Sequence, residues 1–170
     1  MKIRSATSAD IHSILSLERK SVTAAHWTQT QYRQALEGEG QSQSQSQSQR
    51  RLLLVAHDSS SISSGLEISA GAGTDIVGFL VAVHLAPDWE LENIVVAPSA
   101  RRNGLGQRLL DACLAAAREN NSASVFLEVR ESNGAARSLY EKAGFEQIGR
   151  RKSYYSNPSE DAILYRFNLG

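Results

Sequence analysis

Residues 93–108 combine apolar, basic and glycine residues in a pattern that suits anion binding. A hydrophobic run ends near Pro98, and Arg101-x-x-Gly104-x-Gly106 then opens a predicted helix. Glycines let backbone N–H groups approach a phosphate, and a helix N-terminus contributes about half a positive charge. The stretch lacks the G-x-G-x-x-G spacing of dinucleotide-binding loops and the G-K-[ST] ending of P-loops. Taken alone, it indicates either an anion cradle or a tight strand-to-helix turn.

A second motif lies downstream, after another apolar run. It reads Asn133-x-x-Ala136-x-x-Leu139-Tyr140-x-x-x-Gly144-Phe145. We call residues 101–108 the glycine loop. Together with this loop, the second motif resembles the GNAT family of acetyl-CoA-dependent N-acetyltransferases. In that family the first motif binds the pyrophosphate of the cosubstrate and the second forms a further cofactor segment.

The resemblance extends to a bacterial branch of the family that acetylates the N-terminal alanine of a small-subunit ribosomal protein. It covers most of the chain outside two inserts. The additional points of likeness are Trp27-Thr28, Asn93-Ile94, Leu127 to Arg130, Arg150 to Tyr155 and Glu160 to Ile163. Related N-terminal acetyltransferases share several of these, so they discriminate less than the glycine loop does.

The resemblance implies a general base and a proton donor. Glu128 is the expected base, acting on the acceptor amine, with Glu92 as a rival because acids on that earlier strand serve in many family members. Tyr140 is the expected donor to the leaving thiolate, since a phenol with a pKa near 10 is protonated at neutral pH. The structural alternatives are a Glu128 carboxylate paired with Arg130 or Arg137, and a Tyr140 that only packs in the core.

The resemblance also implies where acetyl-CoA binds. The backbone of Ile94, Val95 and Val96 is expected to pair with the pantetheine arm, and the N–H of Val95 or Val96 to polarise the thioester carbonyl. The cofactor-binding residues expected in the glycine loop are Arg101, Arg102, Asn103, Gly104, Leu105, Gly106, Gln107 and Arg108.

Two residues of the second motif complete the expected cosubstrate site. Asn133 is expected to cap the following helix, to bind the pantetheine arm, or to do both. Arg137, one turn further on, either reaches a phosphate or is an exposed helix charge.

Acceptor selection is assigned, through the same resemblance, to aromatic and acidic residues. Trp27 is either a selector or a core anchor between the first two helices. Tyr154 and Tyr155, beside Glu160 and Asp161, are expected to hold a basic peptide. The implied partner is a protein N-terminus, in particular that of a ribosomal protein. The alternatives are acetylation of lysine, polyamine or another small amine, and a CoA-binding module without catalysis.

Hydrophobic periodicity supplies the elements that must position these residues. The expected order is β-α-α-β-β-β-α-β-α-β-β, an α/β (α+β) GNAT fold with a mixed central sheet flanked by helices. The expected strands are 2–5, 52–56, 76–83, 91–96, 125–129, a strand from Gly144-Phe145 through Ile148, and 162–167. The expected helices are 8–18, 28–36 with a Thr28/Gln31 capping box, 104–120 and 136–143.

The length of 170 residues predicts one domain over 1–170. Two segments are expected to be loop expansions of that domain: a low-complexity Gln/Ser loop at 38–50 and a Ser/Gly-rich hairpin insert at 58–74. The Gln-Ser alternation offers no apolar side chain to bury, so it cannot offset its ordering entropy.

Composition excludes several classes of function. Lys+Arg and Asp+Glu are equal at 18 each, which argues against a global basic field for nucleic acid. Cys113 is the only cysteine, which excludes an internal disulfide, and its place on an apolar helical face predicts a packed thiol. The four histidines lack metal-ligand spacing, so no metal is expected. Without a signal-like or membrane-spanning apolar run, we expect a cytoplasmic protein, with a monomer favoured.

Overall fold

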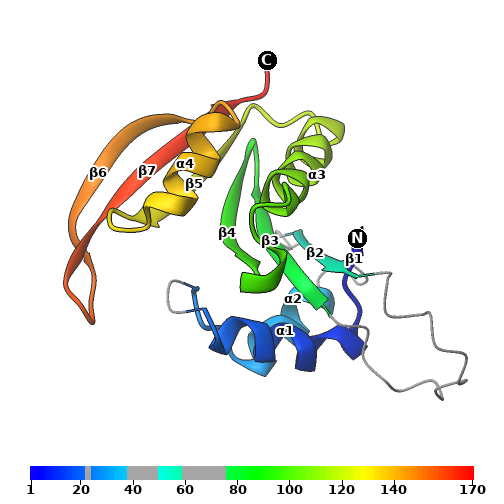
Figure 1. The fold of residues 1–170 in the computed structure, drawn as a ribbon. Helices are drawn as coiled ribbons and strands as arrows, with labels where there is room; N and C mark the ends of the chain where they lie inside the picture. Colours follow the sequence, from blue (N-terminus) through cyan, green and yellow to red (C-terminus); the bar gives the residue numbers. More distant parts are fainter. Residues whose placement is uncertain (22–23, 38–49, 59–75) are drawn as a thin grey trace, which may run out of the picture.

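Seven strands form one mixed sheet in the computed structural model, which describes residues 1–21, 24–37, 50–58 and 76–170 (Figure 1). The strands are β1 (Lys2–Ser5), β2 (Arg51–His57), β3 (Ile76–Leu85), β4 (Asp88–Val96), β5 (Ser124–Arg130), β6 (Glu146–Tyr155) and β7 (Glu160–Asn168). The helices are α1 (Ile11–Arg19), α2 (Gln29–Glu37), α3 (Leu105–Glu119) and α4 (Gly134–Lys142), with 3-10 turns at Ser8–Asp10 and Pro98–Ala100.

The expected fold and element order are confirmed, and two strands extend three or more residues past a predicted end. β4 begins at Asp88, because the strand continues into a tight hairpin in which Leu85 faces Asp88. β6 runs to Tyr155 and not to Ile148. It is an edge strand with almost every residue exposed or half-buried, so it lacks the alternation of apolar and polar residues that identifies a strand. The Gln/Ser loop and the Ser/Gly insert lie outside the described residues except at their ends.

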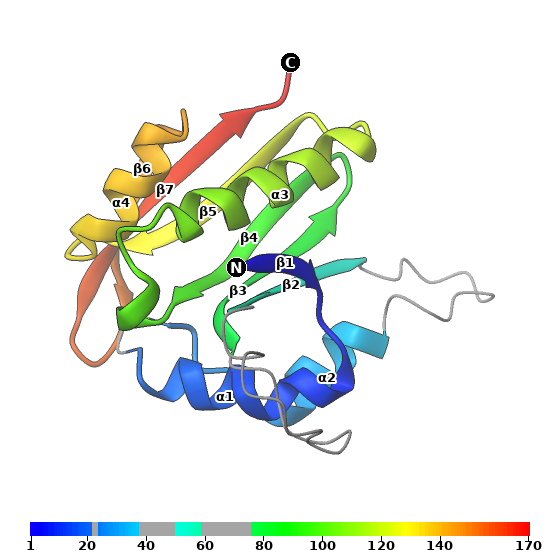
Figure 2. The ribbon, with the colours of Figure 1, turned by 45° about the vertical axis from the view of Figure 1, so that its right-hand side comes forward.

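The sheet has the strand order β1-β2-β3-β4-β5-β7-β6. Only β4 and β5 pair in parallel among the described strands, and they are joined through α3. Figure 2 shows α3 and α4 over one face of the sheet, with α1 and α2 below it. Each helix pair covers its own apolar cluster, one including Leu109 of α3 and Tyr140 of α4, the other Ile14 of α1 and Tyr32 of α2.

Local polar contacts fix the helix starts that the sequence indicates. The backbone N–H of Thr7 donates to the Asp10 carboxylate at 2.8 Å, ahead of α1. At α2, the Thr28 N–H donates to Gln31 Oε1 at 2.8 Å, and the Gln31 N–H donates to Thr28 Oγ1 at 3.3 Å. This reciprocal arrangement is the predicted capping box.

A buried carboxylate ties the two N-terminal helices to β4. Glu18 of α1 is 1% exposed and accepts hydrogen bonds from Tyr32 Oη at 2.7 Å and Asn93 Nδ2 at 2.9 Å. Since a buried carboxylate without partners is unfavourable, these bonds fix α1 and α2 against the central strand.

The remaining expectations concern Cys113, metals and membranes. Cys113 is fully buried on α3, which confirms the predicted packed thiol. Burial raises the pKa of this thiol to about 12. Within the described ranges, no group of three or more His, Cys, Asp or Glu side chains is arranged to hold a metal ion. None of the helices described is both long and apolar enough to span a bilayer.

Candidate active site

The central parallel pair, β4 and β5, separates part of the way along its length. The strands pair at Trp89–Leu91 with Val125–Leu127, and in the described part of the chain the pairing stops there, although both strands continue. Figure 1 shows the two arrows diverging toward their ends. A cavity of about 430 Å³ lies at this split. We call it the split cavity; it is bordered by residues 24–26, 91–94, 128–130, Asn133, Ala136, Tyr140 and residues 155–157.

The backbone of β4 faces this split with unpaired hydrogen-bonding groups. The N–H of Ala97 donates to Val77 on β3 at 2.8 Å. Successive N–H groups of a strand point to opposite edges, so those of Val96 and Ile94 point away from β3, toward the split. Of the two donors left open by the sequence, this geometry favours Val96 over Val95, whose side chain is buried under α1 and α2.

The glycine loop connects β4 to the N-terminus of α3. Arg102 and Gly104 both have left-handed backbone conformations, with φ of 63° and 70°. Gly104 is the N-cap residue of α3 and has no side chain to cap it, so the N–H groups of the first turn have no partner within the helix. Gly106 lies against α4, where an added Cβ would stand 3.2 Å from a methyl group of Leu139. The loop therefore lies at the carboxyl end of β4, with its backbone packed closely against α4 at Gly106.

Most side chains of this loop bind to the protein itself. Arg101 Nε donates to the Val96 carbonyl at 3.1 Å, and Arg108 donates to the Met1 carbonyl at 3.1 Å. Gln107 Nε2 donates to Asp111 at 2.8 Å. The positive charge that the loop arginines could offer to a phosphate is therefore reduced, because the guanidinium of Arg108 is directed to the chain's N-terminus.

The other loop side chains divide into one buried group and two exposed ones. Leu105 is 2% exposed and belongs to the core under α3, so only its backbone faces the loop. Arg102 and Asn103 are exposed. The loop therefore combines two exposed polar side chains with a backbone surface.

Asn133 and Arg137 hold the start of α4 in place. Asn133 Oδ1 accepts the N–H of Ala136 at 3.3 Å, which confirms the predicted cap, and the side chain also borders the split cavity. Arg137 donates to the Glu131 carbonyl and to the Tyr165 hydroxyl, each at 3.2 Å. The bond to Tyr165 contributes most to raising the pKa of Arg137, and the charges of Glu141 and Glu131 raise it further. The two bonds use two of the five N–H donors of the guanidinium, so the remaining donors are open to a phosphate.

Tyr140 is the buried aromatic residue of α4 that borders the split cavity. It is 5% exposed and packs against Phe145 and Tyr165, with ring centroids 5.8 and 6.1 Å away. Burial, with a smaller contribution from Tyr155, raises the pKa of the Tyr140 phenol above its ordinary value. The hydroxyl is therefore protonated at neutral pH and can donate a proton. It is both the core aromatic and the cavity residue that the sequence left as alternatives.

Glu128 borders the split cavity and a second cavity of about 430 Å³ on the sheet surface. We call the second the face cavity; its walls include Leu85, Glu90, Phe126, Glu128, Ile148, Arg151 and Tyr154. Glu128 forms an ion pair with Arg151 of β6 at 3.0 Å. The expected alternative partners are engaged elsewhere, Arg130 with Glu160 at 3.1 Å and Arg137 with Tyr165. The cation beside Glu128 is thus one that the sequence reasoning missed.

The two other acids of β4 differ in their contacts. Glu92 occupies a β-bulge, since Val81 pairs with Asn93 and Ala82 with Leu91. Its carboxylate pairs with Arg51 at 3.2 Å, and it borders the split cavity, so it stays a rival to Glu128. Glu90 borders the face cavity instead and is half-buried. Burial raises the pKa of Glu90, and the charges of Glu92 and Glu128 raise it further.

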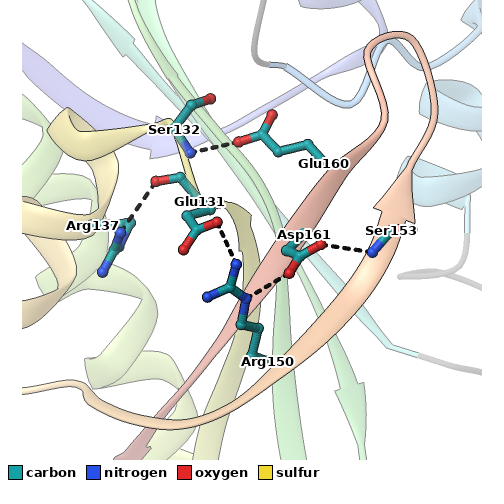
Figure 3. A network of polar contacts seen from close by, with 7 residues as sticks. All are labelled: Glu131, Ser132, Arg137, Arg150, Ser153, Glu160 and Asp161. Carbon is teal, nitrogen blue, oxygen red and sulfur yellow. Dashed lines mark hydrogen bonds and ion pairs between the residues drawn. The ribbon is translucent and has the colours of Figure 1, made fainter.

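The residues expected to hold a basic peptide are only partly available. In Figure 3, Glu160 accepts the N–H of Ser132 at 2.5 Å, and Asp161 binds both Arg150, at 2.6 Å, and the N–H of Ser153. These contacts lower the pKa of both acids, the backbone bonds contributing most. The Asp161 carboxylate therefore stabilises the β6–β7 hairpin, and the Glu160 carboxylate holds β7 to the end of β5. The expectation that they bind a peptide lacks support in this arrangement.

The aromatic selectors separate in the same way. Trp27 packs against Tyr32 with the two rings tilted and their centroids 5.3 Å apart, and Arg51 lies over its ring, which supports the core-anchor alternative. Tyr154 borders the face cavity and Tyr155 the split cavity. The two tyrosines at the end of β6 therefore lie where an acceptor could meet Glu128.

Comparison with known proteins identifies the family. Residues 22–145 match the acetyltransferase (GNAT) family. The [ribosomal protein bS18]-alanine N-acetyltransferase of Haemophilus influenzae is 39% identical over 92 residues, which cover 52% of this chain and 62% of that protein. The protein of the same name from Escherichia coli K12 is 36% identical over 91 residues, with the same coverage. The match spans about three fifths of the length of these curated relatives.

Solved structures resemble the whole chain. Ard1 from Thermoplasma volcanium superposes with a TM-score of 0.75 at 27% identity, covering 98% of this chain and 96% of that one. The ribosomal-protein-S18-alanine N-acetyltransferase of Escherichia coli shares the fold with a TM-score of 0.69 at 24% identity, covering 99% and 94%. Because the family match covers more than half of its residues, this chain belongs to the GNAT acetyltransferase family.

Proposed function

We propose that this protein transfers the acetyl group of acetyl-CoA to the N-terminal α-amine of a protein, in particular the N-terminal alanine of a ribosomal protein. The observation that carries the proposal is that Glu128 and Tyr140, from β5 and α4, border one cavity at the split of the central sheet. Family membership and the names of the curated relatives support the same assignment.

The residues around the split fit acetyl-CoA as the donor. The unpaired N–H groups at the start of α3 and the left-handed Gly104 suit a pyrophosphate, which binds to backbone donors at a helix N-terminus. The free edge of β4 from Ile94 to Val96 suits the amide groups of a pantetheine arm, which can pair with it like a strand. Arg102 and Asn103 add exposed polar side chains, and Leu105, Gln107 and Arg108 contribute mainly their backbone.

Three groups of the chain perform the transfer. Glu128 accepts a proton from the acceptor's ammonium group, so that the neutral amine can form its bond to the thioester carbonyl carbon. The Val96 N–H donates to the carbonyl oxygen while negative charge develops there. Tyr140 donates its proton to the sulfur as the carbon–sulfur bond breaks, which releases CoA as a neutral thiol. The nitrogen then loses its second proton, which restores the Tyr140 phenol. The two groups that move protons, Glu128 and Tyr140, both border the split cavity.

An N-terminal acceptor places a modest demand on Glu128. An α-amino group has a pKa near 7.7–8.0 and a lysine side chain near 10.4. The difference of about 2.5 units corresponds to about 3.4 kcal/mol of deprotonation free energy. A single carboxylate base near neutral pH therefore suits the α-amine better than the lysine side chain.

Transfer to a panel of amines tests the proposal, with release of CoA thiol as the readout. The panel holds a hexapeptide with a free N-terminal alanine, the same peptide N-terminally blocked and containing lysine, and spermidine. We expect turnover only on the free alanine peptide. Turnover on the blocked peptide or on spermidine would move the function to side-chain or small-amine acetylation. CoA binding without turnover on any amine would contradict the enzymatic assignment.

A further inference from the structure

The face cavity has the walls of a pocket for a long basic side chain. Leu85 at its rim is 39% exposed, Ile148 is 51% exposed, and Tyr154 is 50% exposed. These are the large hydrophobic side chains that the described residues leave most open to solvent, apart from the N-terminal methionine. An apolar rim of this kind suits the aliphatic stem of lysine or arginine, whose charged end needs a polar partner deeper in the pocket.

Glu90 offers such a partner. Among the described residues it takes part in no hydrogen bond and no ion pair, whereas Glu92 and Glu128 are each paired with an arginine. It is half-buried, and the fold holds it beside two other carboxylates. Arg151 attracts Glu90 through its charge but makes no hydrogen bond or ion pair with it, so a cation in direct contact would gain the attraction of this partly desolvated carboxylate.

Arg151 shows that a guanidinium fits this environment. Its side chain borders the face cavity, with its guanidinium 3.0 Å from Glu128 and 5.4 Å from the ring centroid of Tyr154. The side chain is 55% exposed, and ion pairs exposed to this degree contribute little to stability. A ligand cation could therefore share or replace its position at low cost.

The spacing between Glu90 and Glu128 sets which acceptor residue reaches the cavity. Glu90 pairs with Phe126 across the parallel strands, and Glu128 lies two residues further along β5. From the spacing and rise of strands, their Cα atoms are roughly 8 Å apart. If the α-amine of the acceptor peptide lies at Glu128, its first residue, when extended, spans about 3.5 Å toward Glu90. A long side chain on the second residue can span the remaining distance.

We propose that the face cavity binds the lysine or arginine side chain of the acceptor's second residue, with Glu90 as its counter-ion. This inference rests on the proposed function, because the α-amine of the same peptide must lie at Glu128. Tyr154 stacks on the cation and the apolar rim packs on its stem. Glu90 is thus a specificity-determining residue, separate from the groups that move protons.

Three alanine-starting hexapeptides that differ only at residue two test the proposal: arginine, its neutral isostere citrulline, and glutamate. We expect the kcat/KM of the protein for the arginine peptide to exceed that for the citrulline peptide about tenfold, mainly through KM, as a charge-assisted contact predicts. In Glu90→Gln the ratio falls to near one, while the citrulline peptide is unaffected. Glu119→Gln, an exposed acid on α3, is the matched control and keeps the ratio.

Reversing the charge at position 90 adds a test in which the proposal predicts a gain of activity on one peptide and not only a loss. Glu90→Lys should favour the glutamate peptide over the arginine peptide, and melting temperatures with bound CoA check that each variant is folded. If a variant does not fold, the arginine-to-citrulline ratio of the unmodified protein still decides. Equal turnover of all three peptides would overturn the subsite and leave the proposed function standing. Failure to acetylate any of them would overturn both.

Discussion

The donor and acceptor sides of the split are built from different parts of the chain. On the donor side, Arg101, Gln107 and Arg108 bond to the protein itself, and the backbone of the glycine loop is left to meet a ligand. On the acceptor side, charged side chains such as Glu90 and Arg151, from separate strands, form the walls. A ligand shared by a whole family can be held by backbone groups, which do not change with sequence. Selection of one acceptor requires side chains.

The largest effect is expected at the junction of the two sides. Glu128→Gln removes the proposed base while keeping the size of the side chain, so kcat should fall at least about 100-fold at neutral pH. Acetyl-CoA binding, measured by calorimetry, should be unchanged, because the donor side binds through its backbone. Glu92→Gln is the matched comparison and should retain most of the activity. Full kcat of Glu128→Gln at every pH would assign the base elsewhere.

Tyr140→Phe is expected to have the next largest effect. Loss of the proton donor should lower kcat about tenfold or more, with little change in KM for either substrate. If the CoA thiolate leaves without a proton donor, kcat would not change, and Tyr140 would have no part in the mechanism. Single-turnover measurements of CoA release separate the chemical step from product dissociation.

The same variant tests a pH dependence of stability. Because the folded-state pKa of Tyr140 is raised above the ordinary value near 10, its contribution to the free energy of unfolding is complete below about pH 10 and is lost as the pH rises further. Denaturant titrations above pH 10 should therefore show a shallower decline for Tyr140→Phe, by up to about 1.4 kcal/mol per pH unit. If the free energy of unfolding declines equally with pH in both proteins, burial does not raise the pKa of the Tyr140 phenol.

A smaller effect is expected in the backbone of the donor side. Gly104→Ala places a side chain at φ of 70°, where strain and not crowding is the cost, since an added Cβ meets nothing within 4 Å. The free energy of unfolding should fall by about 1 kcal/mol, and KM for acetyl-CoA should rise severalfold. Gly134→Ala has the same open space without the positive φ and should change neither. Equal behaviour of both variants would contradict the importance of the loop conformation.

The smallest effect is expected for Arg108→Ala. Its guanidinium binds the Met1 carbonyl, so KM for acetyl-CoA should stay within about twofold of the unmodified protein. A rise of tenfold or more would show that this arginine turns to the phosphate, and the donor side would then depend on side chains as the acceptor side does. Initial rates at saturating acceptor peptide measure the difference.

The donor side could be predicted because its signals are local. The glycine loop and the Asn133 cap each lie within a short stretch of sequence, and Asn133 borders the cavity that Glu128 and Tyr140 share. The choice between Val95 and Val96 could not be made from sequence, because it depends on which edge of β4 pairs with β3. Hydrogen-bond direction at Ala97 supplies that information.

The acceptor side could not be predicted because it depends on tertiary contacts. β6 is an exposed edge strand, so no alternation of apolar and polar residues predicts that it extends to Tyr155. The contact of Arg151 with Glu128 depends on that extension and could not be predicted either. Glu90 received no role from the sequence, because alternation does not show which faces of a sheet form a cavity. Glu160 and Asp161 were expected to bind a peptide because the sequence does not show their bonds to Arg130 of β5 and Arg150 of β6, which lie far from them in the chain.

The burial of Cys113 has a practical consequence. A thiol with no exposed surface and a pKa of about 12 is almost entirely unreactive toward alkylating reagents near neutral pH. The native chain therefore offers no competing site for a cysteine-directed fluorophore or spin label. A cysteine introduced at Ser156, beside the split cavity, would carry the only reactive thiol and could report acceptor binding from a single defined position.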